Sequence, residues 1–180
     1  MGTSPKDKIR EVRGLGDRGA WPEVLAFARK WYAERPVDAK ALFYQGVALA
    51  AMGRFAEAET AYRRTVKLDE ADFMAWNNLA ALLFEALNRA PEGVQCLAQG
   101  LKLDPGNKLG WANLASMNGQ LGRHQQALEC AERALALDPQ MVEAQLHRAR
   151  AAQILGRVEI VRAASEALSR VPLEQFRRAR

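Results

Sequence analysis

Few side chains in this sequence have the types and spacing that catalysis, metal binding or cofactor binding requires. The two histidines, His124 and His147, do not fall into a metal-ligand spacing. The sequence contains no nucleophile elbow, phosphate-binding glycine loop or dinucleotide fingerprint. Paired carboxylates such as Glu57 and Glu59 lie on helix faces that we expect to be solvated. We therefore predict no catalytic residue, no metal site and no cofactor, and we do not expect an enzyme.

The two cysteines give a prediction about redox state. Cys96 and Cys130 lie 34 residues apart, at the same place in successive units of the repeat described next. Equivalent positions on packed helices are expected roughly 9–10 Å apart, which exceeds the limit of about 7 Å between the Cα atoms of a disulfide. We predict two reduced, partly buried thiols.

The elements that position these residues are five repeated units. The residues that end a helix recur with spacings of 34, 35, 34 and 34 residues, at Gly19, Gly53, Asn88, Gly122 and Gly156. Gly and Asn enter the left-handed conformation at a helix end at low cost. A second boundary, often ending in Pro, recurs between them, so each unit is predicted to be a hairpin of two helices. The units span about residues 6–36, 38–70, 72–105, 107–139 and 141–171.

Composition supports an all-α fold. The chain is 49% apolar and 26% charged, and good helix formers dominate. No stretch alternates β-branched and polar residues over the length of a strand. No apolar run reaches the 18 residues or so of a membrane span, and no signal peptide is recognised at the start. We expect no membrane insertion and a cytoplasmic location.

A pair of large and small residues, four positions apart, recurs in the first helix of the units. The pairs are Leu42 and Gly46, Trp76 and Ala80, Trp111 and Ala115, and, more weakly, Gln145 and Ala149. With the Gly and Pro punctuation, this pattern resembles the tetratricopeptide repeat over roughly residues 5–172. The resemblance implies a right-handed α-solenoid of antiparallel hairpins, one array over residues 1–180, with 173–180 as a candidate capping helix. Trp76 and Trp111 are predicted to be buried between hairpins.

Two units depart from the pattern. In the first, Lys8 and Glu11 occupy positions that call for apolar residues, so we expect its first helix to be short, frayed or a cap. In the third, one extra residue lies near Phe84, between Trp76 and Asn88. A π-bulge or an adjusted turn between the two helices would absorb it. Of these alternatives, we expect the adjusted turn.

The resemblance also implies a binding groove along one face of the first helices. In the third unit, a buried stripe at Leu79, Ala80 and Leu83 leaves Asn78 and Ala81 on the adjoining face, which lines the concave groove of similar proteins. The groove residues predicted in this way are Lys40, Phe43, Tyr44, Val47, Met74, Asn77, Asn78, Ala81, Phe84, Asn113, Ser116, His147 and Arg150.

Two features of this set have alternative interpretations. Asn78 and Asn113 occupy the same repeat position, where an amide can pair with a peptide backbone, as the resemblance implies; Asn is also simply common there. Phe43 and Tyr44 either anchor an apolar partner or pack against the first unit, and we expect Tyr44 to face the groove. A carboxylate clamp of the type found in some repeat proteins is not expected, because its pair of cations is missing.

These observations predict an adaptor that binds a peptide or helix of a partner protein. The alternative is a small chaperone that shields a segment of its client, and self-association through the terminal hairpins is a further expectation. The net charge of +5 is concentrated near the two ends of the chain. RNA binding is disfavoured, because Lys40 and Arg150 are the only cations in the predicted groove.

Overall fold

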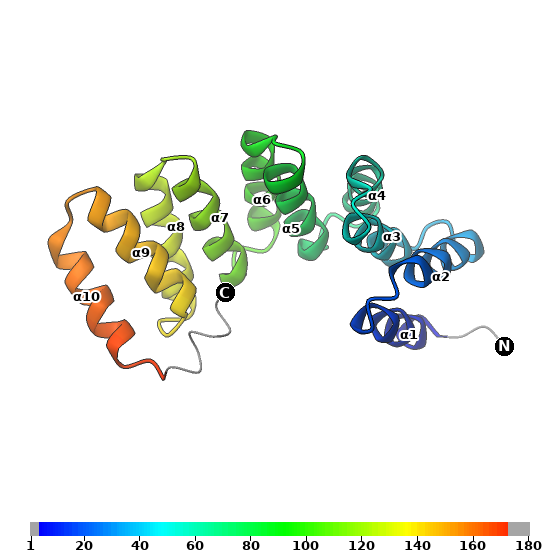
Figure 1. Ribbon diagram of the computed structural model, residues 1–180, viewed down its shortest axis with the longest axis horizontal. Helices are drawn as coiled ribbons and strands as arrows, with labels where there is room; N and C mark the ends of the chain where they lie inside the picture. The colour runs from blue at the N-terminus through cyan, green and yellow to red at the C-terminus, as the bar shows by residue number, and fades with distance from the viewer. Residues whose placement is uncertain (1–3, 173–180) are drawn as a thin grey trace. The chain divides into compact units, whose positions relative to one another are not determined.

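The computed structural model describes residues 4–172, and every regular element in this range is a helix (Figure 1). The chain divides into two units between Leu103 and Asp104. The helices of the first unit are α1 (Pro5–Asp17), α2 (Trp21–Glu34), α3 (Ala39–Ala51), α4 (Phe55–Leu68), α5 (Phe73–Ala81), the π-helical segment η1 (Leu82–Ala86) and α6 (Ala90–Leu103). Those of the second are α7 (Lys108–Gln120), α8 (His124–Leu137), α9 (Val142–Ile154) and α10 (Val158–Ser169). The predicted all-α, solenoid-type fold is confirmed.

Within each unit, consecutive helices pack against one another as hairpins. The odd-numbered helices α1, α3, α5, α7 and α9 are the first helices of these hairpins, and the even-numbered helices are the second. Whether the two units form one continuous array stays a prediction.

The predicted helix ends are confirmed by the backbone. The five break residues all have positive φ, with values of 70°, 73°, 52°, 70° and 68° in chain order. Asn88 is the non-glycine member, consistent with the tolerance of Asn for the left-handed region. The breaks therefore fix where each first helix stops and its partner helix begins.

The first helix is longer and more regular than we predicted from its polar residues. α1 has 13 residues, and the hydroxyl of Ser4 accepts a hydrogen bond from the backbone N–H of Asp7 at 3.2 Å. Lys8 is buried, forms an ion pair with Glu34 of α2, and has its ammonium 5.8 Å from the ring centroid of Trp31. The expectation of a short or frayed helix was wrong, because a Lys can bury its aliphatic stem when its charge has a partner.

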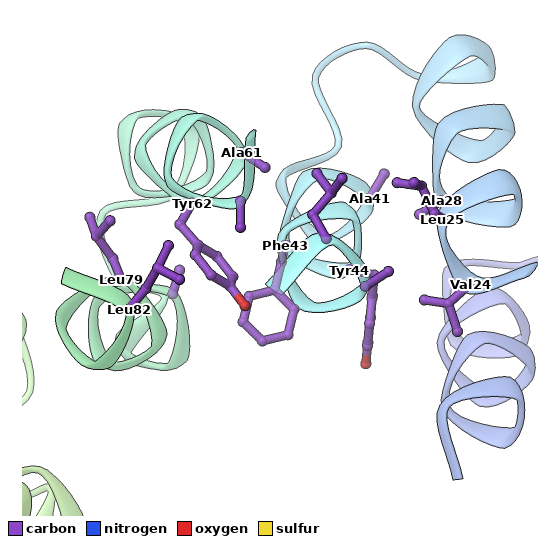
Figure 2. Packing of buried hydrophobic residues seen from close by; sticks show 14 of the residues in the cluster. Val24, Leu25, Ala28, Ala41, Phe43, Tyr44, Ala61, Tyr62, Leu79 and Leu82 are labelled. Carbon is purple, nitrogen blue, oxygen red and sulfur yellow. The ribbon is translucent and has the colours of Figure 1, made fainter. Parts of the chain in front are cut away.

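A row of aromatic side chains connects α2, α3 and α4. Trp31 of α2 is 2% exposed and stacks on Tyr44 of α3, with ring centroids 6.4 Å apart. Phe43 lies 5.3 Å from Tyr44 and 6.1 Å from Tyr62 of α4, again between ring centroids. Figure 2 shows the rings of Phe43 and Tyr62 side by side, one from each helix. This row is the centre of the core of the first unit.

The large residue of each first helix makes the same hydrogen bond in three hairpins. The indole N–H of Trp76 donates to the carbonyl of Glu70 at 2.9 Å, and that of Trp111 donates to the carbonyl of Pro105 at 2.9 Å. In the fifth hairpin, the amide of Gln145 donates to the carbonyl of Pro139 at 3.1 Å. Gln145 therefore makes the hydrogen bond that tryptophan makes in the other two hairpins. Trp76 and Trp111, which were predicted to be buried, are only half-buried.

The extra residue of the third unit lies inside its first helix. Residues Leu82–Ala86 form a π-helical turn, and the backbone N–H of Leu87 donates to the carbonyl of Leu82 at 3.0 Å. Our expectation of an adjusted turn was wrong, and the π-bulge alternative describes the chain. The wider turn accommodates the additional residue while Leu82 and Leu83 stay in the core, 6% and 0% exposed.

Close approach of α5 and α6 depends on Gly93. A Cβ at this position would lie 2.7 Å from the carbonyl oxygen of Ala80 and 3.1 Å from the Cβ of Phe84. Because a backbone oxygen cannot rotate away, we expect Gly93→Ala to push the helices apart and to lower the free energy of unfolding by about 1–3 kcal/mol. Urea denaturation measures the loss.

The matched control is Gly14→Ala in α1, where an added Cβ would meet no atom within 4 Å. There we expect a gain of roughly 0.5–1 kcal/mol from reduced backbone entropy of the unfolded chain. Equal effects of the two substitutions would contradict the assignment of Gly93 as a close-packing residue.

Candidate functional site

The burial of the first helices follows the predicted stripe. Leu79, Ala80 and Leu83 are each 0% exposed, whereas Asn78 and Ala81 are half-buried on the adjoining face. Hairpin packing therefore leaves this face of α5 as surface, as the helical period requires.

The two aromatic residues of α3 that were predicted to line the groove are largely buried in the core. Phe43 and Tyr44 are each 9% exposed. Tyr44 stacks on Trp31, and its hydroxyl accepts a hydrogen bond from the Nε of Arg13 of α1 at 3.1 Å. Tyr44 thus packs against the first hairpin, which was the alternative to the groove position we expected for it.

The remaining predicted residues of α3 and α5 have different degrees of exposure. Lys40 pairs with Asp72 at 2.8 Å and lies 5.6 Å from the ring centroid of Phe43. Val47 is half-buried against the core of the first unit. Met74 is 54% exposed, and Asn77 is half-buried. Of these four, Met74 presents the largest apolar surface to a partner.

A cavity of about 230 Å³ lies beside Asn78 and Ala81. The residues that line it come from the end of α3, from α4, from α5 and from the π-helical turn: Ala50, Phe55, Tyr62, Asn78, Ala81, Leu82, Glu85 and Ala86. Phe55 is 37% exposed, and Glu85 is exposed, so the cavity opens to solvent. We call it the first-unit cavity.

Of the eight residues that line this cavity, only Asn78 and Ala81 were in the predicted set. Phe55 and Tyr62 belong to a second helix, whereas the prediction considered first helices alone. Glu85 lines the cavity in place of Phe84, whose Cβ instead faces Gly93 of α6. The extra residue near Phe84 was a usable signal, but the rotation that a π-turn adds to the following side chains is not visible in sequence.

Asn78 and Tyr62 both line this cavity, and their side chains interact. Burial raises the pKa of Tyr62 to about 12, and the hydrogen bond with Asn78 opposes this shift in part. The phenol that neighbours the amide of Asn78 therefore stays protonated at neutral pH.

The phenol of Tyr62 gives a pH-dependent prediction. Its pKa is about 12 in the folded chain, against an ordinary value of 10.0. The unfolded chain therefore releases this proton first, so the stability that the group contributes is present below pH 10 and is lost as the pH rises toward 12. We expect this loss to be on the order of 3 kcal/mol.

Urea unfolding across this pH range, compared between the natural chain and Tyr62→Phe, measures the contribution of Tyr62 alone. Ultraviolet titration should show a phenol that ionises near pH 12 in the natural chain and not in the variant. Identical pH dependence of the two proteins would contradict the shift.

In the second unit, three predicted residues meet at another cavity. Ser116 of α7 and His147 and Arg150 of α9 line a space of about 170 Å³, together with Gln120, His124 and neighbouring small residues. Burial lowers the pKa of His147, and the positive charge of Arg150 lowers it further. Asn113 is exposed and does not line this space. We call it the second-unit cavity.

Pairing of Asn78 and Asn113 with the backbone of a partner peptide remains a prediction. Asn78 belongs to the first unit and Asn113 to the second. Asn78 is engaged with Tyr62, and Asn113 also takes part in an interaction within the chain. Any contribution of these amides to partner binding therefore comes from their remaining hydrogen-bonding capacity.

The two thiols are free, in agreement with the prediction. Cys96 is half-buried and Cys130 is buried. Burial raises the pKa of both thiols, that of Cys130 to about 11. Since the thiolate is the reactive form, neither cysteine has the properties of a nucleophile at neutral pH.

Two features are absent from residues 4–172. No helix in this range is long and apolar enough to cross a lipid bilayer. No group of three or more His, Cys, Asp or Glu side chains in the same range is arranged to hold a metal ion.

Comparison with known structures extends the likeness of fold over nearly the whole chain. PilF of Pseudomonas aeruginosa is 22% identical, with a TM-score of 0.80 over 91% of this chain and 74% of that one. MamA from Desulfovibrio magneticus RS-1 is 22% identical, with a TM-score of 0.73 over 98% and 97% of the two chains. YrrB, described as a tetratricopeptide-repeat protein with an unusual peptide-binding site, is 14% identical, with a TM-score of 0.71 over 91% and 86%.

Sequence comparison places most of the units in one family. Tetratricopeptide-repeat models match residues 22–73, 45–108 and 109–141. No curated protein matches the sequence significantly. Repeats of this family generally act as protein-interaction scaffolds rather than as enzymes. The chain consists of helical hairpins whose first helices end at residues with positive φ. Because the family models also match most of its length, the chain belongs to the tetratricopeptide-repeat family.

Proposed function

We propose that this protein is a non-enzymatic adaptor that binds a peptide or a helix of a partner protein along the face of its first helices. The family supports the proposal, because its members are generally interaction scaffolds. YrrB supports it as well, since the published description of its structure names a peptide-binding site.

The first-unit cavity is the observation that carries this proposal. It contains Asn78 and Ala81, which helical periodicity places beside the buried stripe, on the face that the family resemblance implies for binding. Its volume of about 230 Å³ exceeds what one ordered water needs. Its wall is apolar at Phe55 and Leu82, with the carboxylate of Glu85 on one side. A cavity with this lining fits one side chain of a peptide that lies across α3 and α5.

Asn78 supplies the polar contact for the backbone of such a peptide. A side-chain amide has two N–H donors and a carbonyl with two lone pairs. The interaction of this amide with Tyr62 leaves further hydrogen-bonding capacity for a ligand. Backbone pairing of this kind holds a peptide without reading its side chains, so sequence preference would come from the cavity.

Replacement of the two asparagines tests the backbone contact. We expect Asn78→Ala combined with Asn113→Ala to weaken peptide binding about tenfold, since each hydrogen bond contributes about 0.5–1.5 kcal/mol. The ligand is a peptide selected on the natural protein from a random display library, and its affinity is measured by fluorescence anisotropy.

Tyr62→Phe is the matched control, because it removes the interaction between Tyr62 and Asn78 but keeps the amide of Asn78. This control should lose less affinity than the double variant. If the double variant keeps its helicity and also binds the peptide with unchanged affinity, the backbone contact is refuted.

A further inference from the structure

The two cavities occupy equivalent places in the repeat. Each lies at the end of one first helix, the start of the second helix that follows, and the first helix of the next hairpin. In the first unit these elements are α3, α4 and α5 with η1, and in the second they are α7, α8 and α9. The lining residues that correspond, two repeats apart, are Phe55 and His124, Asn78 and His147, and Ala81 and Arg150.

These three exchanges change the chemistry of the cavity. The first-unit cavity has neutral side chains at the three positions and the carboxylate of Glu85 nearby. In the second-unit cavity, the same positions carry two imidazoles and a guanidinium. α7 adds Ser116 and Gln120, which are uncharged and joined by a 3.3 Å hydrogen bond. The second-unit cavity is therefore basic where the first is not.

The basic groups of the second-unit cavity have no acidic partner among the described residues. Within residues 4–172, the side chains of His124, His147 and Arg150 form no hydrogen bond or ion pair with another residue. Glu143 of α9 influences His147 only through its charge, and its effect on the pKa of His147 is smaller than those of burial and of Arg150. Hydrogen-bond donors thus converge on a half-buried space whose lining contains no carboxylate.

An anion satisfies this arrangement, and a cation does not. A carboxylate can accept from a guanidinium in a paired geometry and from an imidazole at the same time, and such charge-assisted bonds are the strong ones. A metal ion would meet the positive charge of Arg150 and only two imidazole ligands. A space of about 170 Å³ has room for the end of one acidic side chain.

We propose that the second-unit cavity binds the carboxylate of an Asp or Glu side chain of the partner peptide, with Arg150 as the main cation and His147 and His124 as further donors. The inference rests on the proposed adaptor function and adds a specificity to it. The peptide would carry an acidic residue that contacts α9.

Acetate tests the carboxylate chemistry on the full-length chain without any peptide. Sodium acetate is titrated against sodium chloride at constant ionic strength, and the imidazole resonances of His124 and His147 are followed by NMR. We expect acetate to shift the signals of His147 saturably and to raise its pKa, because a bound anion favours the charged imidazole. In Arg150→Gln, the acetate affinity should fall about tenfold.

The groups that face His147 determine how acetate affinity depends on pH. Arg150 and Glu143 share its helix, His124 comes from α8, and α7 contributes only uncharged side chains. Acetate affinity should therefore increase as the pH falls through the pKa that His147 has in the acetate-bound state. No response to acetate, or a stronger saturable response to inorganic phosphate, would overturn the proposal.

Selected peptides separate this inference from the adaptor function. Peptides enriched on the natural protein should carry an acidic residue at a fixed place, and exchange of that residue for its amide should weaken binding about tenfold. The same exchange should have little effect on binding to Arg150→Gln. If the peptides bind without any acidic residue, the adaptor function stands and the carboxylate site is refuted. If no peptide is enriched, both are refuted.

Discussion

Trp31→Ala should destabilise the first unit by about 3–5 kcal/mol, the range measured when large aromatic residues are removed from protein cores. Trp31 is 2% exposed and packs between Tyr44, on which it stacks, and Phe27, whose ring centroid lies 6.4 Å away. Its indole N–H also donates to Asp38 at 2.8 Å. The substitution removes these contacts together and leaves a cavity between α2 and α3.

The effect should extend to the start of α3. Asp38 precedes this helix, and its second carboxylate oxygen accepts a hydrogen bond from the backbone N–H of Lys40 at 3.1 Å. Without Trp31 this carboxylate loses the partner that orients it. Because neighbouring repeats stabilise one another in arrays of this kind, loss at α2 should also lower the cooperativity of unfolding.

Trp76→Ala is the matched control, since it removes the same atoms from a half-buried site. Urea unfolding, followed by circular dichroism, should give a clearly smaller loss for Trp76→Ala than for Trp31→Ala. Equal losses, or a loss below about 1 kcal/mol at Trp31, would contradict the central place of this residue in the core.

Ala81→Trp should abolish most peptide binding without unfolding the chain. Ala81 is half-buried at the end of α5 and lines the first-unit cavity, so an indole at this position fills the space that the peptide side chain would occupy. We expect the affinity for a selected peptide to fall at least about tenfold, which corresponds to about 1.4 kcal/mol of binding free energy.

Ala26→Trp is the control for this experiment, because Ala26 is exposed on α2, a second helix. It adds the same bulk and should leave the affinity unchanged. Ala81→Leu gives a smaller block and guards against misfolding of the larger variant. Full binding by a folded Ala81→Trp protein would show that the cavity takes no part in recognition.

The architecture could be predicted from sequence because its signals are local and repeated. A left-handed break needs only Gly or Asn at one position, so Gly53 and Asn88 identify helix ends without knowledge of the rest of the chain. Helical periodicity then separates the buried face of α5 from the face that carries Asn78 and Ala81.

The predictions that failed depend on partners that are distant in sequence. The burial of Lys8 requires Glu34, which lies 26 residues away. Tyr44 faces the first hairpin because Trp31 and Arg13 are placed to receive it. Residue types alone suggested that α1 is short or frayed and that Tyr44 faces the groove. Both predictions fail because of the way in which three helices pack together.

The candidate site was predictable in part for the same reason. Asn78, Ala81, Ser116, His147 and Arg150 follow from the period of the first helices, and the structure places them at two cavities. The residues contributed by second helices do not follow from it. The register of the side chains in the π-helical turn, where Glu85 takes the place expected for Phe84, depends on how the extra residue is absorbed.

Peptide binding along the first helices is tested most directly by mapping the bound peptide on the full-length protein. Backbone amide chemical shifts are recorded as a selected peptide is added. Binding as proposed predicts the largest changes at Asn78, Ala81 and Glu85, with little change at Arg64 and Lys67 on the exposed surface of α4. Large changes at Arg64 and Lys67 with none at Asn78 and Ala81 would contradict it.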